Sequence, residues 1–191
     1  FRITESTEVK PGDDWARWNG GNAGTRNSGD IIQPPLNIAW MANTGGMIGL
    51  SSPVLSDGIL AIGVADTSNR KECGVAAFNA KTGKQRWHYR TDSAIKGHVA
   101  IDDGRVFAVS ITGFLYSIDL KTGKLLWRNE LNRQIERWEI SSPAIADGVV
   151  YAGNPSYLAA FDARTGKSIW SQSIHTSTDK DGNRIWNGQH F

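Results

Sequence analysis

The chain has 191 residues, of which 39% are hydrophobic and 21% are charged, and this balance excludes a disordered chain. Lysine and arginine (21) nearly balance aspartate and glutamate (19), so the net charge of +2 gives no argument for nucleic acid or an anionic membrane surface. No run of 18 apolar residues predicts a membrane span, and the single cysteine, Cys73, excludes an intrachain disulfide framework and a zinc site built on several thiolates.

The first element in chain order is a lead-in that we place at residues 1–35. It begins at Phe1 without a charged-then-apolar leader, so no signal peptide is predicted. Its segment Asp13–Gly29 is rich in glycine, and we expect it to be extended and to pack Trp15 or Trp18 on the domain that follows. A strand is then predicted over Leu36–Ala42, which carries Trp40.

Internal repeats organise the rest of the chain. Three segments align without gaps, and their final tryptophans are 40 and 43 residues apart: Ala77–Trp87, Ser117–Trp127 and Ala160–Trp170. Asp-Gly pairs share the period and separate two apolar runs in each unit: Asp57-Gly58, Asp103-Gly104 and Asp147-Gly148. Asp-Gly favours a two-residue hairpin turn, because glycine adopts a positive φ at no steric cost.

Each unit is therefore predicted to form four short strands. In the third unit we expect them at Glu139–Ile145, Val149–Gly153, Tyr157–Asp162 and Ser168–Gln172. Four strands with a period near 40–47 residues are typical of a β-propeller blade. A β-sandwich also has strands at this density, but it does not need one Thr-Gly-x-x-x-Trp turn three times.

The predicted fold class is all-β, a propeller of four-stranded antiparallel blades that forms an incomplete ring. We expect about three blades with partial blades at each end, within a propeller that spans residues 36–191: blades at about 48–90, 97–129 and 138–172, and the start of another at 184–191. Because the pattern stops within a unit, we favour a fragment of a longer protein over copies that assemble into a ring.

The repeated Ala-x-Asp-x-x-Thr-Gly-x-x-x-Trp segment resembles the tryptophan-docking motif of the pyrroloquinoline-quinone-like repeat family, which includes the quinoprotein alcohol dehydrogenases. Ala160–Trp170 matches at every defined position, whereas Asn79 and Ser117 are departures in the other two copies. The resemblance implies structural docking roles for a set of tryptophans and turn glycines: Trp87, Trp127, Trp170, Gly83, Gly123 and Gly166.

The resemblance does not fix the function, since the repeat occurs in quinone dehydrogenases, in outer-membrane assembly lipoproteins and as modules of envelope enzymes. The dehydrogenases place two adjacent cysteines against the quinone, and Cys73 stands alone. We find no match to their calcium ligands, no metal-type spacing among the histidines, and no catalytic residues. We therefore expect no cofactor in this chain, and the quinone only in a complete parent propeller.

Length variation indicates where a ligand would bind. Extra residues fall at about Asp66–Cys73, between the second and third strands, and at about Asn132–Trp138, between blades. Since antiparallel strands alternate in direction, both loops emerge on one face, opposite the tight turns. The candidates on this face are mostly charged: Arg70, Lys71, Glu72, Arg133, Arg137, Trp138, Arg184 and Trp186. Trp138 is the strongest, with packing under its own loop as the alternative.

Three functions remain open from the sequence. The preferred one is a non-catalytic scaffold or protein-interaction module, part of a larger periplasmic or extracellular protein as the family resemblance implies. The alternatives are part of a quinone-dependent dehydrogenase whose cofactor site lies in missing blades, and a carbohydrate-binding module of an envelope enzyme. We expect as partners another protein or the remaining blades, or a second copy at the open edges, and we expect neither nucleic acid nor a membrane span.

Overall fold

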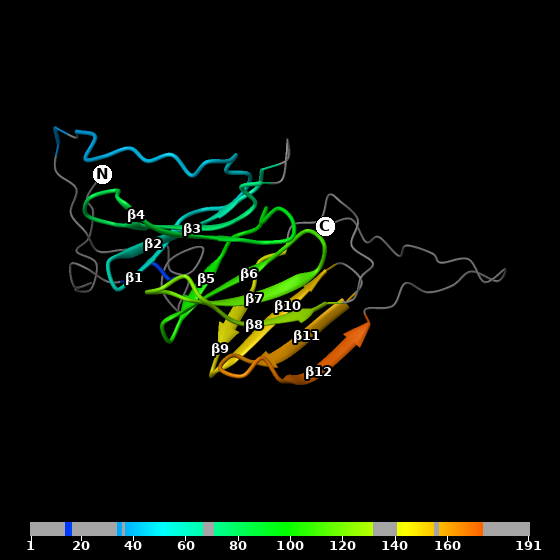
Figure 1. Ribbon diagram of the computed structural model, residues 1–191. Helices are drawn as coiled ribbons and strands as arrows, with labels where there is room; N and C mark the ends of the chain where they lie inside the picture. The colour runs from blue at the N-terminus through cyan, green and yellow to red at the C-terminus, as the bar shows by residue number, and fades with distance from the viewer. Residues whose placement is uncertain are drawn as a thin grey trace, which may run out of the picture.

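The computed structural model describes residues 14–16, 34–35, 37–66, 71–131, 141–154 and 157–173. These residues form three four-stranded antiparallel sheets, which confirms the predicted all-β blades (Figure 1). The first sheet consists of β1 (Val54–Ser56), β2 (Ile59–Val64), β3 (Gly74–Asn79) and β4 (Gln85–Arg90). The second consists of β5 (Ala100–Asp102), β6 (Arg105–Val109), β7 (Phe114–Asp119) and β8 (Leu125–Glu130). The third consists of β9 (Ala144–Ala146), β10 (Val149–Asn154), β11 (Tyr157–Asp162) and β12 (Ser168–Ser173). Nowhere in these ranges is there a helix long and apolar enough to cross a membrane.

The Asp-Gly pairs make the tight turn between the first two strands of each sheet. In the first sheet Asp57 and Gly58 have φ of 50° and 67°, and the other two turns have similar values. Positive φ at both central residues is what a two-residue type I′ hairpin requires, and its twist matches that of the strands. The aspartate thus adopts the left-handed region as well, which is uncommon for residues other than glycine.

The Thr-Gly turn between the third and fourth strands is closed by a side chain at its start. In the second sheet, Asp119 Oδ1 accepts hydrogen bonds from the Thr122 amide and hydroxyl, both at 2.7 Å. Gly123 then takes a φ of 71°, and its N–H donates to the Asp119 carbonyl at 2.9 Å. Asn79 holds the first turn in the same way through its amide oxygen, so its departure from the motif preserves the hydrogen bonds.

The sheets are arranged as a fan with their first strands innermost, since β1 contacts β5 and β5 contacts β9. The middle sheet is buried on both sides, and its side chains alternate between them. In β6, Val106 and Ala108 join the core shared with the first sheet, whereas Phe107 and Val109 join the core shared with the third. This burial explains why the middle strands are almost continuously apolar.

The segment of residues 37–50, called the strap from here on, differs from its prediction. The expected strand over Leu36–Ala42 is wrong for residues 37–42, which pair with no strand in the described part of the chain. The strap instead crosses the outer side of the first sheet (cyan in Figure 1), where a Cβ on Gly46 would lie 2.7 Å from Val64 Cγ1. The innermost strand of the third sheet is also shorter than predicted, because β9 begins only at Ala144.

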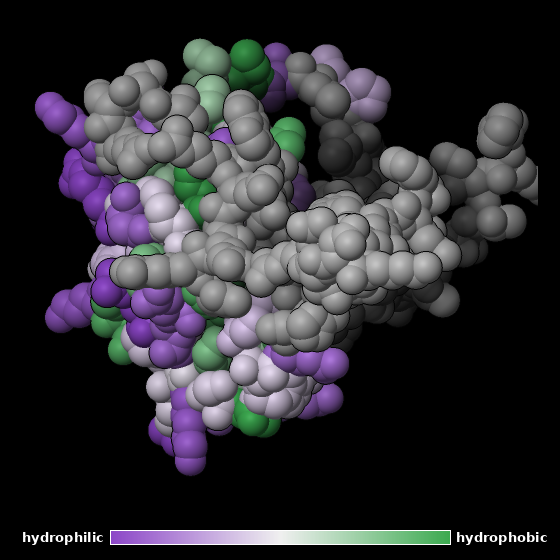
Figure 2. All heavy atoms as spheres, turned by 90° about the vertical axis from the view of Figure 1, so that its right-hand side faces the viewer, coloured by the Kyte–Doolittle hydropathy of each residue, from purple (hydrophilic) through white to green (hydrophobic). Residues whose placement is uncertain are grey.

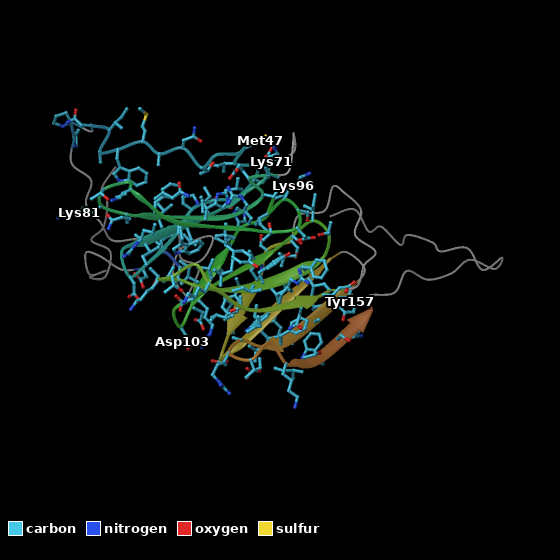
Figure 3. All side chains as sticks on the ribbon, in the orientation of Figure 1. Met47, Lys71, Lys81, Lys96, Asp103 and Tyr157 are labelled. Atoms are coloured by element: carbon cyan, nitrogen blue, oxygen red, sulfur yellow. The ribbon has the colours of Figure 1, made fainter. Side chains whose placement is uncertain are left out.

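The loops sort onto two opposite faces, as the alternation of strands predicts. Figure 3 shows Lys71, Lys96 and Tyr157, which lie in or beside the connections from a second to a third strand or from one sheet to the next, on one side of the molecule. Lys81 and Asp103, which lie in the tight turns, are on the other side. We call these sides the loop face and the turn face.

Candidate interaction surfaces

Three tryptophans join neighbouring elements by the same contact. Trp87 Nε1 donates to the Leu120 carbonyl of the next sheet at 2.9 Å, and Trp127 Nε1 donates to the Ala163 carbonyl at 3.1 Å. Trp40 of the strap does the same to Ala80, at 2.9 Å. In each case the accepting carbonyl lies three residues before the glycine of the Thr-Gly turn, so each indole is held at a fixed place on the following sheet.

The turn glycines lie directly under these indole rings. A Cβ on Gly83 would be 2.6 Å from the ring of Trp40, one on Gly123 2.6 Å from Trp87, and one on Gly166 2.7 Å from Trp127. Carbon atoms in contact normally keep about 3.5–4.0 Å apart. Each contact therefore needs glycine for two reasons, the positive φ and the close approach of the indole.

Trp170 occupies the same motif position in the third sheet but has different surroundings. It is 41% exposed, it contacts the Tyr151 ring at a centroid distance of 6.2 Å, and no described carbonyl accepts its indole N–H. Leu158 on the neighbouring strand is 39% exposed. Among the described residues, this side of the third sheet is thus an apolar surface that lacks the contact made by the other three tryptophans.

On the loop face, Lys71 and Glu72 lie beside the end of β4. Arg90 Nη2 donates to both carboxylate oxygens of Glu72 at 3.0 Å, and Arg90 Nε donates to the Lys71 carbonyl at 2.9 Å. The strap covers the same carboxylate, because a Cβ on Gly45 would lie 3.5 Å from Glu72 Oε2. Glu72 therefore ties three parts of the first blade together.

His88 shares this cluster and is the deepest of its ionisable groups. Its side chain is 8% exposed, and its Nδ1 lies 3.4 Å from Glu72 Oε2, while Nε2 has no hydrogen-bond partner. Burial lowers the pKa of His88, an effect opposed by the Glu72 carboxylate and reinforced by the Arg90 guanidinium. The neutral imidazole is the form that this site favours.

A second polar cluster joins the first two sheets on the loop face. The Tyr116 hydroxyl donates to Asp92 Oδ1 at 2.5 Å, and the Thr112 hydroxyl donates to the other oxygen of the same carboxylate. Burial, and then the hydrogen bond to Asp92, raise the pKa of Tyr116, so its hydroxyl stays protonated. Asp92 lies in the connection after β4 and Tyr116 in β7, so the cluster fixes one blade to the next.

A third contact links the connections that lead into the inner strands. The Ser52 N–H donates to His98 Nδ1 at 3.0 Å, and the His98 N–H donates to the Ser142 hydroxyl at 2.9 Å. Each of these residues stands just before the innermost strand of its own sheet. Burial lowers the pKa of His98, so its ring nitrogen is kept available as an acceptor.

The structure brings together only part of the predicted ligand face. Of its predicted residues, only Lys71 and Glu72 are described, and these sequence neighbours both bond Arg90. Arg70, Arg133, Arg137, Trp138, Arg184 and Trp186 lie outside the described residues. Sequence reasoning missed Arg90, Asp92 and Tyr116, and it considered the histidines, His88 among them, only as metal ligands. The available signal was the strand direction, which places the end of β4 next to the loop before β3.

Within the ranges that the structure describes, no three or more histidine, cysteine, aspartate or glutamate side chains gather closely enough to hold a metal ion. The Cys73 thiol is buried and donates to the Asp66 carbonyl at 3.0 Å. Figure 2 shows the molecule from the loop face, where most of the hydrophilic residues of the described surface lie along the left margin, with some hydrophobic residues between them.

Comparison with known families gives one match that spans most of the chain. The model described as outer membrane protein assembly factor BamB matches residues 19–190. An assembly factor of that name from Yersinia pestis is 29% identical over 167 residues, which cover 78% of this chain and 40% of that protein. The quinohemoprotein alcohol dehydrogenase ADH IIB from Pseudomonas putida is 27% identical over 155 residues, covering 71% of this chain and 22% of the enzyme.

Solved structures show the same fold. A quinohemoprotein alcohol dehydrogenase from Comamonas testosteroni superimposes with a TM-score of 0.71 at 24% identity, covering 86% of this chain and 28% of the enzyme. A europium-containing methanol dehydrogenase gives a TM-score of 0.69 at 20% identity, covering 87% of this chain and 33% of the enzyme. The chain thus spans less than half of the length of each of these relatives.

Proposed function

The chain belongs to the family described as outer membrane protein assembly factor BamB, and from this premise we propose that it is a non-catalytic, protein-binding part of a larger β-propeller protein outside the cytoplasm. The proposal keeps the division predicted from the sequence, a lead-in over residues 1–35 and a propeller over residues 36–191. The named relatives include an assembly factor and alcohol dehydrogenases, so the choice between a scaffold and an enzyme depends on this chain's own residues.

The observation that carries the proposal is the pairing of charged and polar groups on the loop face. Glu72 is held by Arg90, and Asp92 is held by Tyr116 and Thr112. Catalytic and ligand-binding groups are typically directed into a pocket, with protein contacts that leave a coordination or hydrogen-bonding position for the substrate. These carboxylates are instead directed at neighbouring strands and loops, which is expected of groups that stabilise a scaffold.

The contacts of the loop-face residues favour the scaffold over the dehydrogenase alternative, which requires a quinone. The two loop-face carboxylates Glu72 and Asp92 are engaged by an arginine and by hydroxyl groups, and the Cys73 thiol faces a backbone carbonyl. The carbohydrate alternative rests on Trp138, which lies outside the described residues, and no observation favours it.

The test measures binding of the two kinds of ligand to the same sample. An outer-membrane β-barrel protein is labelled with a fluorophore, unfolded in urea and diluted. Its fluorescence anisotropy should rise to a plateau as increasing amounts of this chain are added. Pyrroloquinoline quinone with calcium should leave the tryptophan fluorescence without a saturable change. Stoichiometric quinone binding, or the absence of β-barrel binding, would contradict the proposal.

A matched pair of variants locates the surface. Lys71→Glu on the loop face and Lys81→Glu on the turn face make the same change of charge on opposite sides of the first blade (Figure 3). Binding through the loop face predicts at least a fivefold weaker affinity for Lys71→Glu and an unchanged one for Lys81→Glu. Equal effects would remove the loop face from the proposal.

A further inference from the structure

A short piece of the lead-in, Asp14–Ala16, lies between the innermost strands of the first two sheets (dark blue in Figure 1). The Leu55 N–H of β1 donates to the Trp15 carbonyl at 2.7 Å, and the Ile101 N–H of β5 donates to the Ala16 carbonyl at 2.8 Å. Trp15 also forms an antiparallel bridge with Leu55. Two consecutive carbonyls are thus bonded to two different blades.

The register of the strands explains why these N–H groups are available. Leu55 and Ile101 each stand two residues before the aspartate of the Asp-Gly turn, where they pair with Leu60 and Val106. In a two-residue hairpin the pair next to the turn exchanges hydrogen bonds, and the following pair directs its N–H and C=O groups outward. Since β1 and β5 are the inner edges of their sheets, both N–H groups point toward the space between them. Such an edge accepts an added strand.

Side chains add specificity to these backbone contacts. Asp14 Oδ1 accepts a hydrogen bond from the Asp57 N–H at 3.2 Å, and the Ser56 hydroxyl donates to the other carboxylate oxygen. Ala16 packs against the core between the first two sheets, where a small residue is accommodated. The Asp57 carboxylate, which could repel Asp14, faces Lys121 with Nζ 3.9 Å from Oδ2.

We propose that the inner edges of β1 and β5 form a binding site, called the groove from here on, for an extended peptide with a carboxylate followed two residues later by a small side chain, and that this chain fills the groove with its own residues 14–16. The N–H groups of Leu55 and Ile101 donate hydrogen bonds to two peptide carbonyls. The Ser56 hydroxyl and the Asp57 N–H donate to the carboxylate. A partner segment of this pattern enters only when the lead-in leaves. The groove goes beyond the proposed function, because it lies on inner strand edges and not on the loop face.

The test uses the full chain and a labelled peptide of residues 11–20. In the variant Asp14→Ala/Ala16→Lys the lead-in loses its carboxylate and carries a side chain that the core cannot accommodate. This variant should bind the peptide saturably and at least tenfold more tightly than the unchanged chain, in which the groove is filled. The same peptide with Asp14→Ala should bind at least tenfold more weakly. Equal binding by both proteins, or none by the folded variant, would overturn the proposal.

Amide hydrogen exchange supplies an independent reading of the same groove. In the double variant the amides of Leu55 and Ile101 should lose protection together and regain it when the peptide is added. Ile145, at the equivalent place in β9, is bonded by none of residues 14–16 and serves as the control. If the double variant does not fold, Asp14→Ala alone should lower the protection of both amides, and unchanged protection would refute the groove. A negative β-barrel result leaves these exchange rates unaffected, so the two proposals fail separately.

Discussion

The glycines under the indole rings are constrained both by their backbone conformation and by the ring above them. Gly123 combines a φ of 71° with an indole that leaves no room for a Cβ. Gly104, in the same sheet, has a φ of 68° but no atom within 4 Å of the position of a Cβ. Substitutions at Gly104 and Gly123 therefore distinguish the cost of backbone strain from the cost of a steric clash.

We expect Gly104→Ala to lower the free energy of unfolding by about 1–2 kcal/mol, which is the cost of a left-handed alanine. Gly123→Ala should lower it by about 2–4 kcal/mol, because a clash with Trp87 is added to the same strain. Urea unfolding followed by circular dichroism measures both values. Equal losses would show that the indole moves aside at no cost.

His88 makes stability depend on pH in a direction that its burial determines. The folded state lowers the pKa of His88 below the ordinary value of 6.5, so near and below that pH the unfolded chain binds a proton that folded His88 does not. The free energy of unfolding should therefore fall as the pH drops from 7.5 through 6.5. The fall ends once the pH is below the folded pKa.

The variant His88→Gln should show a smaller loss between pH 7.5 and pH 5.5 than the unchanged chain. His98 also has a lowered pKa, but it is present in both proteins and cancels in the comparison. Urea unfolding at the two pH values measures the difference. An identical loss in both proteins would show that His88 is protonated alike in the folded and unfolded states.

At the scale of elements, the Thr-Gly turn depends on one oxygen at its start. The Thr122 hydroxyl and amide hydrogen bonds lower the pKa of Asp119, and the equivalent bonds from Thr165 lower that of Asp162. A lowered carboxylate pKa stabilises the fold at neutral pH, and this contribution is lost as the pH falls through the folded pKa. Asn79 makes the same bonds without a titrating group.

We expect Thr122→Val to raise the pKa of Asp119 toward its ordinary value of 3.8, because the hydroxyl is the largest cause of the shift. Carbon-detected nuclear magnetic resonance of the side-chain carboxyl follows the titration. Thr82→Val in the first turn is the control, since it should leave the titration of Asp119 and Asp162 unchanged. An unaltered Asp119 pKa in Thr122→Val would show that backbone N–H groups alone hold it.

The repeated elements could be predicted because their signals are local. An Asp-Gly pair or a Thr-Gly turn specifies its own backbone, and the apolar runs between them can only form strands. The strap could not be predicted in this way. Leu36–Ala42 has the composition of a strand and the position of a docking tryptophan, but a strand also needs a neighbour, and composition does not supply one.

At the scale of the whole molecule, the sheets are stabilised unequally. The first two sheets each contribute a tryptophan to the next and receive one on their own turn glycine. The third receives Trp127, while its own Trp170 is 41% exposed. In a row of similar units, stability depends on the contacts between neighbours.

Amide exchange should therefore be slowest in β7 and β8 and faster in β12. Mass spectrometry of the exchanging chain measures all three strands in one sample, and β4 provides an internal comparison, because its Trp87 is docked. Trp127→Ala should accelerate exchange in β12 further, since it removes the contact from the preceding sheet. Equal protection of β8 and β12 would show that the indole contacts do not set local stability.

The candidate surface was less predictable than the fold. Loop lengths predicted a ligand face that includes Lys71, and the structure has Lys71 on the same side as Lys96 and Tyr157, because strand direction follows from counting. The bonds of Glu72 with Arg90 and of Asp92 with Tyr116 join residues 18 and 24 positions apart, so no local pattern encodes them. The groove of residues 14–16 was missed for a related reason, since its donors are backbone groups that every sequence possesses.

The indole contacts also have a polarity. The inserting groups are the indoles of Trp40, Trp87, Trp127 and Trp170, and the receiving sites are the turns at Gly83, Gly123 and Gly166. Each of the three receiving turns already holds a tryptophan of the described chain, so Trp170 is left without a receiving turn among the described residues. Contacts of this one-way kind otherwise propagate from copy to copy into rings or open filaments. The strap places Trp40 on Gly83 and thereby blocks the addition of another copy at this end of the row. Trp170 of another copy can dock on Gly83 only after Trp40 is displaced.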